Sequence, residues 1–336
     1  MTEVLVTGGL GFIGSHTVVS LAYAGFTPVI LDNLSNSRIS VLDGLEQLCG
    51  YRPVFYEGDV NNPEVYDRIC AAHTIQAVIH FAAFKAVGES VEKPLAYYRN
   101  NVGGLISLLE GMQKSGISNL VFSSSCTVYG EPDHVPPDES APVKPAMSPY
   151  GATKQMGEQI LRDIPSIRTQ CLRYFNPIGA HESAQIGELP LGVPNNLVPY
   201  LTQSVAGWRG PLTVHGNDYP TPDGSCIRDY IHVMDLAEAH VAALNRLLGG
   251  KSDSAFEVFN IGTGKGSSVL EVIQAFEEAT GEKVPFTIGP RRPGDIVQVW
   301  ADTQKVDNQL GWKARRDLHT MMKDAWRWQQ QLTRPS

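Results

Sequence analysis

The sequence predicts an α/β fold in which a doubly wound parallel sheet is followed by a smaller α+β domain. In the first half, short apolar runs alternate with helix-length amphipathic segments, which is typical of parallel strands covered on both faces. After about residue 176 the chain changes to longer loops that are rich in proline and glycine. The predicted strands are residues 4–7, 28–31, 54–56, 77–81, 120–123 and 171–174.

The remaining elements follow from the same patterns. Residues 16–24 predict a helix that Gly25 ends. Residues 233–248 and 257–261 predict a helix and a strand that return to the sheet. The C-terminal segment from Thr303 is predicted to be helical, with Trp312 and Trp326 as apolar anchors. We therefore expect two domains, residues 1–176, with returns near 228–262, and residues 177–336.

Composition excludes several classes of protein. The 336 residues carry 27 basic and 35 acidic side chains, a net charge of −8, so binding to nucleic acid or to a membrane surface is not expected. The five cysteines never form a C-x-x-C pair, which argues against a disulfide framework or a metal site. The chain starts without a cationic leader and has no apolar run of about 20 residues, so we expect a cytoplasmic protein.

The first predicted strand runs directly into a glycine cluster, Gly8-Gly9-Leu10-Gly11-Phe12-Ile13-Gly14. Gly8, Gly11 and Gly14 would let the backbone turn tightly and approach a pyrophosphate at the start of a helix. Alone, the cluster also fits an ordinary turn. Asp32, however, ends the second strand about 20 residues further on, where a carboxylate bonds ribose hydroxyls and repels a 2′-phosphate. Together they predict a Rossmann-type site for NAD in preference to NADP.

Two further loops have competing interpretations. Asp59 is a polar strand end on the same rim, although a plain turn residue explains it nearly as well. Residues 261–267 look like a phosphate-binding P-loop, but Phe259 stands where that motif needs its first glycine. A loop followed by a serine cap on a helix from Val269 explains this segment better.

A second group of residues points to proton transfer. Tyr150 and Lys154 are four residues apart and would share one face of a helix that Pro149 begins. An ammonium beside a phenol stabilises the phenolate, which would make Tyr150 a base near neutral pH. Because such a pair also arises by chance, its context decides. Ser123-Ser124-Ser125 end an apolar strand at the rim where a nicotinamide is expected, which predicts a hydroxyl relay beside a hydride acceptor.

With these motifs the chain resembles the extended short-chain dehydrogenase/reductase superfamily and, within it, the UDP-glucose 4-epimerase family. The resemblance covers essentially the whole length. It is carried by residues 7–16 (TGGLGFIGSH), 81–90, 122–130, 172–179, 195–200 and 216–233, of which the last two are specific to the epimerases.

The resemblance implies three sets of site residues. The catalytic set is Ser125, Tyr150 and Lys154. The cofactor set, in addition to the glycines, is Phe12, Ile13, Asp32, Asn33, Leu34, Ser35, Asn36, Ser37, Asp59, Val60, Phe81, Ala82, Ala83, Phe84, Lys85, Asn100 and Phe175. The substrate set is Asn176, Asn196, Leu197, Val198, Thr213, Val214, His215, Arg228, the span 292–295 with Arg292 and Asp295, and Val299.

The implied reaction is 4-epimerisation of a UDP-sugar through a 4-keto intermediate with tightly held NAD. Tyr150 would take the proton of the 4-hydroxyl, Ser125 would relay it, and Arg228 and Arg292 would clamp the diphosphate. Cys126 and Thr127 stand where a 4,6-dehydratase would need a carboxylate pair, which argues against dehydration. Two alternatives remain: an epimerase acting mainly on UDP-N-acetylglucosamine, and a non-catalytic dinucleotide sensor on the same fold.

Two departures from the family pattern affect the predicted function. Val299 stands where relatives restricted to UDP-glucose and UDP-galactose carry a tyrosine, so 2-acetamido sugars are also expected as substrates, although Val299 could equally pack beneath Trp300. Cys126 replaces a small apolar residue and is expected to be buried and unreactive. Relatives are commonly dimers through paired helices, and we expect a homodimer here.

Overall fold

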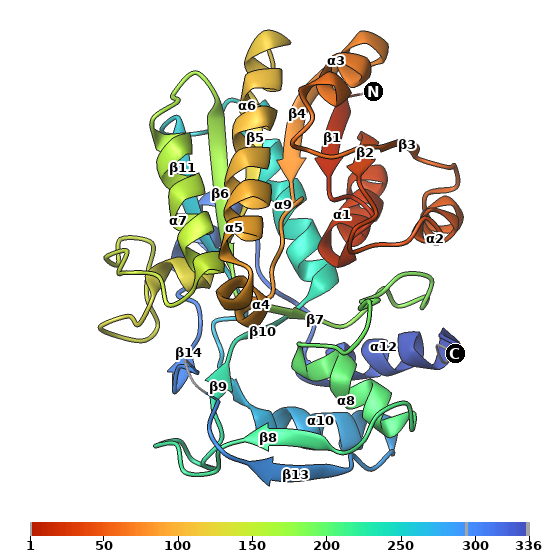
Figure 1. The fold of residues 1–336 in the computed structure, drawn as a ribbon, viewed down its shortest axis with the longest axis vertical. Coiled ribbons are helices and arrows are strands. Elements are labelled where there is room, and N and C mark those ends of the chain that lie inside the picture. Colours follow the sequence, from red (N-terminus) through yellow and green to blue (C-terminus); the bar gives the residue numbers. More distant parts are fainter. Residues whose placement is uncertain (1, 293–294, 334–336) are drawn as a thin grey trace.

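A seven-stranded sheet forms the centre of the computed structural model, which describes residues 2–292 and 295–333 (Figure 1). All its neighbouring strands pair in parallel. In spatial order the strands are β11 (Phe256–Ile261), β6 (Arg168–Tyr174), β5 (Asn119–Ser125), β4 (Ile75–His80), β1 (Glu3–Thr7), β2 (Thr27–Asp32) and β3 (Val54–Glu57). The fold class expected from the sequence is confirmed.

Helices cover both faces of this sheet, as the near-continuous apolar strands require. One face packs on α1 (Phe12–Tyr23), α2 (Val41–Cys49), α9 (Val233–Leu248) and α11 (Gln304–Leu310). The other face packs on α3 (Pro63–Ala72), α6 (Gly104–Lys114) and α7 (Pro149–Arg162). Between α3 and α6 run three short helices: α4 (Val87–Glu92), α5 (Pro94–Tyr97) and the π-helix η1 (Tyr98–Gly103).

The rest of the chain forms a smaller α+β part below the carboxyl ends of the strands in Figure 1. Its helices are α8 (Leu197–Val205), α10 (Val269–Thr280) and α12 (Leu318–Gln331). Its short strands pair as β10 (Tyr230–His232) with β7 (Asn176–Ile178), as β13 (Phe286–Gly289) with β8 (Leu212–His215), and as β12 (Ser267–Ser268), β9 (Ile227–Arg228) and β14 (Gln298–Val299). A separate apolar core holds this part together.

The predicted bounds of several elements need correction. α1 begins at Phe12, four residues before the predicted start, because the glycine turn leads straight into the helix with Gly11 as its N-cap. The C-terminal segment is two helices, since Gly311 adopts a φ of +62° and ends α11. β3 is exposed along much of its length because it is the sheet's edge, and Phe81 lies just beyond β4.

Candidate active site

The glycine turn between β1 and α1 leaves no room for side chains. Gly8 has a φ of +70°, and a Cβ at Gly14 would lie 2.1 Å from the carbonyl oxygen of Gly8. Gly11 has no side chain to cap α1, and the first turn of the helix contains no acidic residue. The uncapped N–H groups and the positive end of the helix dipole therefore face the cavity described below, an arrangement suited to a pyrophosphate.

Asp32 organises the loops beside this turn. Its carboxylate accepts hydrogen bonds from the backbone N–H of Leu10 (3.0 Å) and of Leu34 (2.9 Å), and from the Ser37 hydroxyl (2.8 Å). Asp32 is 7% exposed and lies on the cavity wall. Its Oδ2 accepts a single one of these bonds, so it keeps acceptor capacity for a ribose hydroxyl.

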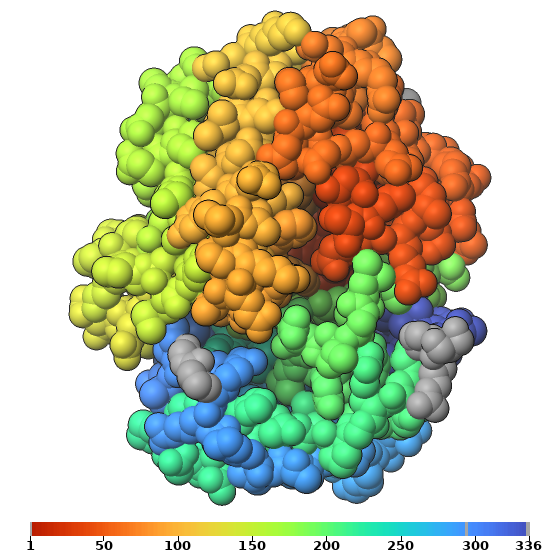
Figure 2. All heavy atoms as spheres, in the orientation of Figure 1, coloured from red at the N-terminus to blue at the C-terminus, as the bar shows by residue number. Residues whose placement is uncertain are grey.

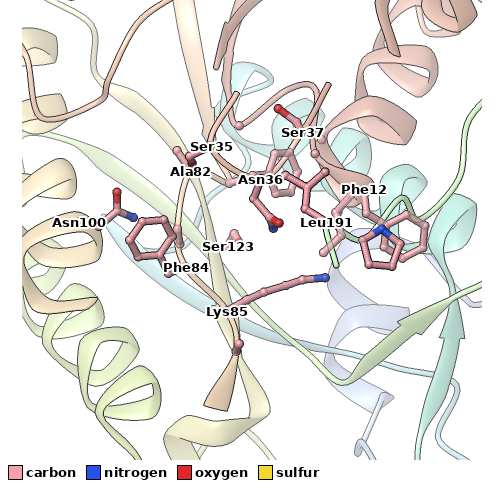
Figure 3. Close-up of a pocket in the computed structure, with 18 of the residues that line it drawn as sticks. Phe12, Ser35, Asn36, Ser37, Ala82, Phe84, Lys85, Asn100, Ser123 and Leu191 are labelled. Carbon is pink, nitrogen blue, oxygen red and sulfur yellow. The ribbon is translucent and has the colours of Figure 1, made fainter. Parts of the chain in front are cut away.

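A cavity of about 710 Å³ extends from the glycine turn to Tyr150. Figure 3 shows part of its lining, including Phe12, Lys85 and Ser123. Such a volume is typical of sites for cofactors and small ligands. Figure 2 shows the surface hollowed between the first half of the chain and the green residues that follow it. The wall contains every residue of the expected cofactor set except Leu34, Asp59 and Phe175.

These three residues lie elsewhere for identifiable reasons. Leu34 packs against the core under α1 and α2. Asp59 is exposed, and its carboxylate accepts hydrogen bonds from Asn61, at 2.8 Å from both the backbone N–H and the side-chain amide, although its neighbours Gly58 and Val60 line the cavity. Phe175 is buried against Val299 and Ala301.

The end of β5 and the first turns of α7 form the other end of the cavity. Pro149 occupies the first turn of α7, and the Ser148 hydroxyl caps it by accepting from the backbone N–H of Gly151 (3.2 Å). Tyr150, Lys154 and Ser123 line the cavity, whereas Ser125, 7% exposed, is not on its wall. The cavity thus brings Tyr150 and Lys154 into one space with the glycine turn.

Burial dominates the ionisation of this pair. Burial raises the pKa of Tyr150 above its ordinary value, and the Ser125 hydroxyl opposes this rise only in part. Lys154 donates to the carbonyl oxygen of Ser123 (2.6 Å), and its Nζ lies 5.9 Å from the centroid of the Tyr150 ring. Burial lowers the pKa of Lys154 to about 8. Burial thus outweighs the Ser125 hydroxyl, and the net effect of the surrounding protein is to raise the pKa of the phenol.

The expected substrate residues surround a different region, and among the members of that set that the structure describes, only Asn196 is on the cavity wall. Asp295 brings two arginines together: its Oδ1 lies 3.6 Å from Nη2 of Arg228 and 2.9 Å from Nη2 of Arg292. Two guanidinium groups converging on one carboxylate would also suit a diphosphate. Residues 293 and 294 of the expected span lie outside the described residues.

The remaining members of the substrate set are placed by the small strands around this pair. Val299 pairs with Arg228 in adjacent strands and is 6% exposed. Asn176 is in β7, residues 213–215 are in β8, and Leu197 and Val198 begin α8. Cys126, half-buried, packs against the cluster of Phe175, Val299 and Ala301, and burial raises the pKa of its thiol to about 11. Cys126 is therefore less buried than expected, and its raised pKa favours the protonated thiol.

The loop that looks like a P-loop binds a carboxylate of the protein itself. Asp229 is completely buried and accepts hydrogen bonds from the backbone N–H groups of Thr263 (2.9 Å), Gly264 (3.1 Å) and Ala301 (3.1 Å). Ser268 then caps α10 in a capping box with Glu271. The loop thus fastens the strand that carries Arg228, and the serine cap expected on this helix is confirmed.

Of the segment that closes the cavity from the second part, sequence reasoning named residues 195 and 196 but missed residues 188–194. Residues 188–191 and 193–196 line it, and Lys85 extends across the cavity (Figure 3). Oε1 of Glu188 accepts from Lys85 Nζ (3.1 Å) and from the Asn196 amide (2.7 Å). The segment has no strand or helix periodicity, so the sequence held no signal for this contact.

Comparison with known proteins shows the family to which the chain belongs. Residues 5–325 match the model of the family described as GDP-mannose 4,6 dehydratase. The UDP-glucose 4-epimerase of Neisseria meningitidis serogroup B is 53% identical over 98% of this chain and 97% of its own length.

Solved structures of similar fold lead to the same family. The UDP-glucose 4-epimerase of Stenotrophomonas maltophila, with bound NAD and formylated UDP-arabinopyranose, is 49% identical, has a TM-score of 0.95 and covers 98% of both chains. That of Bifidobacterium longum, in complex with NAD+ and UDP, is 46% identical, has a TM-score of 0.94 and also covers 98% of both chains. Within the broader dehydratase family, the chain therefore belongs to the UDP-glucose 4-epimerases.

Proposed function

We propose that this chain interconverts UDP-glucose and UDP-galactose by NAD-dependent inversion at C4 of the sugar, through a 4-keto intermediate. The observation that carries the proposal is the single cavity that joins the glycine turn of α1 to the phenol of Tyr150. A dinucleotide fits between them, with its pyrophosphate at the helix and its nicotinamide beside Tyr150. A sensor that only binds dinucleotides would not need Tyr150 and Lys154 buried together at this end.

The residues of the cavity fit NAD. Gly11 and Gly14 let the turn close on the backbone of Gly8, which brings the start of α1 to the place where a pyrophosphate would bind, and Asp32 offers acceptor capacity to a ribose. When bound, NAD would supply the acceptor and donor of the C4 hydride and a positive charge beside the phenol. The negative charge of Asp32 opposes a 2′-phosphate at the same place, so NAD is favoured over NADP.

The chain's own groups would hold and move one proton. The Tyr150 phenolate takes the proton of the sugar's 4-hydroxyl and returns it after the sugar has turned over. The Ser125 hydroxyl lowers the pKa of Tyr150 and would also form a hydrogen bond with the 4-oxygen of the sugar. The Lys154 ammonium, 5.9 Å from the centroid of the Tyr150 ring, would stabilise the phenolate. All three groups are buried, which limits the access of water that would otherwise compete for the proton.

The second part of the chain would hold UDP while the sugar turns. Asp295 brings Arg228 and Arg292 together. A diphosphate would replace its carboxylate or share the two guanidinium groups with it. We therefore assign the binding of NAD to residues 1–176, together with the returning α9 and β11, and the binding of the UDP-sugar mainly to residues 177–336.

Val299 is the residue on which the proposed substrate range depends. It packs with Phe175 and Ala301 against Cys126, the residue after Ser125, so its side chain lies next to the proposed reaction centre. A valine leaves volume that a tyrosine ring would fill. We propose that UDP-N-acetylglucosamine and UDP-N-acetylgalactosamine are also interconverted.

A second copy of the chain is the proposed partner. Exposed apolar side chains occur on neighbouring helices: Val91 on α4 (63% exposed), Leu95 on α5 (78%), Ile106 on α6 (43%) and Met156 on α7 (45%). Figure 1 shows α5, α6 and α7 side by side, and apolar patches of this kind commonly mark an interface. Leu95→Glu is expected to convert a dimer into a monomer in sedimentation equilibrium, whereas Tyr23→Glu, an exposed site on α1, is expected to leave it intact.

Location is proposed on chemical grounds. Unpaired, widely spaced cysteines suit a reducing compartment, so we propose the cytoplasm. Within residues 2–292 and 295–333, no helix combines the length and the apolar character needed to span a bilayer.

The decisive experiment assays the purified protein on UDP-galactose and on UDP-N-acetylgalactosamine, with release and spectroscopy of any bound nicotinamide. We expect bound NAD and turnover of both substrates. Turnover of the acetamido sugar alone would favour the epimerase that acts mainly on UDP-N-acetylglucosamine. Bound NAD without turnover of either would favour the sensor.

A further inference from the structure

A buried ion pair lies behind the proposed catalytic end of the cavity. Glu158 on α7 accepts two hydrogen bonds from Arg173 on β6, from Nε to Oε1 (2.9 Å) and from Nη2 to Oε2 (2.6 Å). The two side chains are 1% and 2% exposed. An apolar pair of similar volume is often at least as stable as a buried ion pair, so stability alone does not account for these charges.

Glu158 is also bonded to the strand that ends in the serines. The Ser124 hydroxyl donates to its Oε1 (2.7 Å), and Arg162 donates to its Oε2 (3.0 Å). One turn earlier on α7, Lys154 donates to the carbonyl oxygen of Ser123. Two successive turns of α7 are thus bonded to two successive residues of β5, directly before Ser125.

The charge of Glu158 acts on Lys154. The other titratable groups that face or adjoin Lys154 come from α7, β4 and β6: Tyr150, His80 and Cys171, with Arg173 beyond Glu158. His80 is neutral because burial lowers its pKa to about 3, and Cys171 is neutral because burial raises the pKa of its thiol. Burial lowers the pKa of Lys154, and the carboxylate of Glu158 opposes this effect.

We propose that Glu158 is a positioning residue for the reaction: its bond to Ser124 fixes α7 on β5, and its carboxylate places a negative charge one turn from Lys154 on the same helix. Arg173 holds the carboxylate in place and balances part of its charge. This inference rests on the proposed function, since it assigns Glu158 a role in that same reaction.

The pH dependence of kcat tests the role of the charge. Glu158→Gln removes a negative charge and is expected to move the alkaline limb, where Lys154 loses its proton, to lower pH by about one unit. Arg173→Met removes a positive charge and is expected to move the limb to higher pH. The double variant is expected to return the limb toward that of the wild type, because the two changes cancel.

Two further variants separate charge from position. Glu158→Asp keeps the charge and is expected to keep the alkaline limb in place, so that the comparison with Glu158→Gln decides the question even if Arg173→Met does not fold. Ser124→Ala removes the hydrogen bond without changing a charge, and is expected to lower kcat several-fold at an unchanged limb.

The matched control is a buried ion pair at the sheet edge. Glu257 on β11 pairs with Arg246 at 2.9 Å, and its side chain is 5% exposed. Glu257→Gln is expected to lower stability and leave the alkaline limb of kcat unmoved. If Glu158→Gln moves the limb no more than Glu257→Gln does while the wild type is active, the inference is overturned and the proposed function stands. A wild type without epimerase activity overturns both.

Discussion

At Tyr150, burial and chemistry act in opposite directions. Burial raises the pKa of the phenol, whereas a base needs the phenolate. Lys154 is bonded to the Ser123 carbonyl at 2.6 Å and cannot offset this alone. Bound NAD would supply a positive charge that favours the phenolate, while Tyr150 is the group that holds and releases the proton.

The hydroxyl of Tyr150 is the atom on which the proposed reaction depends. Tyr150→Phe keeps the ring and removes the base, so turnover of UDP-galactose is expected to fall about a hundredfold or more. Bound NAD and thermal stability are expected to stay close to those of the wild type. Turnover is measured by a coupled assay, and the nucleotide by absorbance after denaturation. A variant that inverts C4 at the wild-type rate would contradict the assignment.

Val299 controls the proposed substrate range. Val299→Tyr adds a ring beside Cys126, and is expected to abolish turnover of UDP-N-acetylgalactosamine while UDP-galactose is still converted. The expected change in discrimination is about 1 to 3 kcal/mol, the range typical of steric rejection in a pocket. Paired kcat/KM values for both sugars measure it. Wild-type protein that does not turn over the acetamido sugar would overturn this part of the proposal.

Among the elements, the turn into α1 is the least tolerant of change. A Cβ at position 14 would lie 2.1 Å from the Gly8 carbonyl oxygen and 2.8 Å from Gly9 Cα, so the backbone itself would have to move. Gly14→Ala is therefore expected to lose bound NAD and to lower the unfolding temperature. Gly88→Ala is the matched control, because a Cβ there meets no atom within 4 Å. Equal NAD content in both variants would refute the expected role of the turn.

The strands and the position of the site could be predicted, but the contacts between elements could not. Apolar runs located each strand of the sheet to within a few residues, because buried parallel strands have no polar alternation. The start of α1 was wrong because apolar periodicity begins only after the glycines. Nothing in the spacing of Glu158 and Arg173 indicated an ion pair, since strands that are adjacent in space bring together residues far apart in the chain.

At the scale of the whole molecule, buried histidines make stability depend on pH. Burial lowers the pKa of His16 and His80 to about 3 and that of His240 to about 4. In the unfolded chain the same rings take up protons near their ordinary pKa of 6.5. Below pH 6.5 the unfolded state therefore binds more protons, and stability falls as the pH drops toward 4.

This dependence is measurable by urea unfolding between pH 7 and pH 5. Each of the three rings is expected to contribute up to about 1.4 kcal/mol per pH unit to the slope. His240→Gln should make the slope shallower, while His134→Gln, in an exposed loop, should leave it unchanged. An identical slope in wild type and His240→Gln would show that His240 is protonated equally in both states.

The return of α9 and β11 to the first half means that the chain cannot be cut into two self-sufficient modules. β11 covers the open side of β6, and α9 covers a face of α1. A fragment that stops at residue 176 would leave β6 as an unpaired edge strand and would expose the apolar face of α1. Such surfaces promote association with other chains. We expect that fragment to aggregate on expression, and its own hydrodynamic radius would show it. Residues 1–176 therefore could not be exchanged with a homologue as a separate unit, whereas surface loops could.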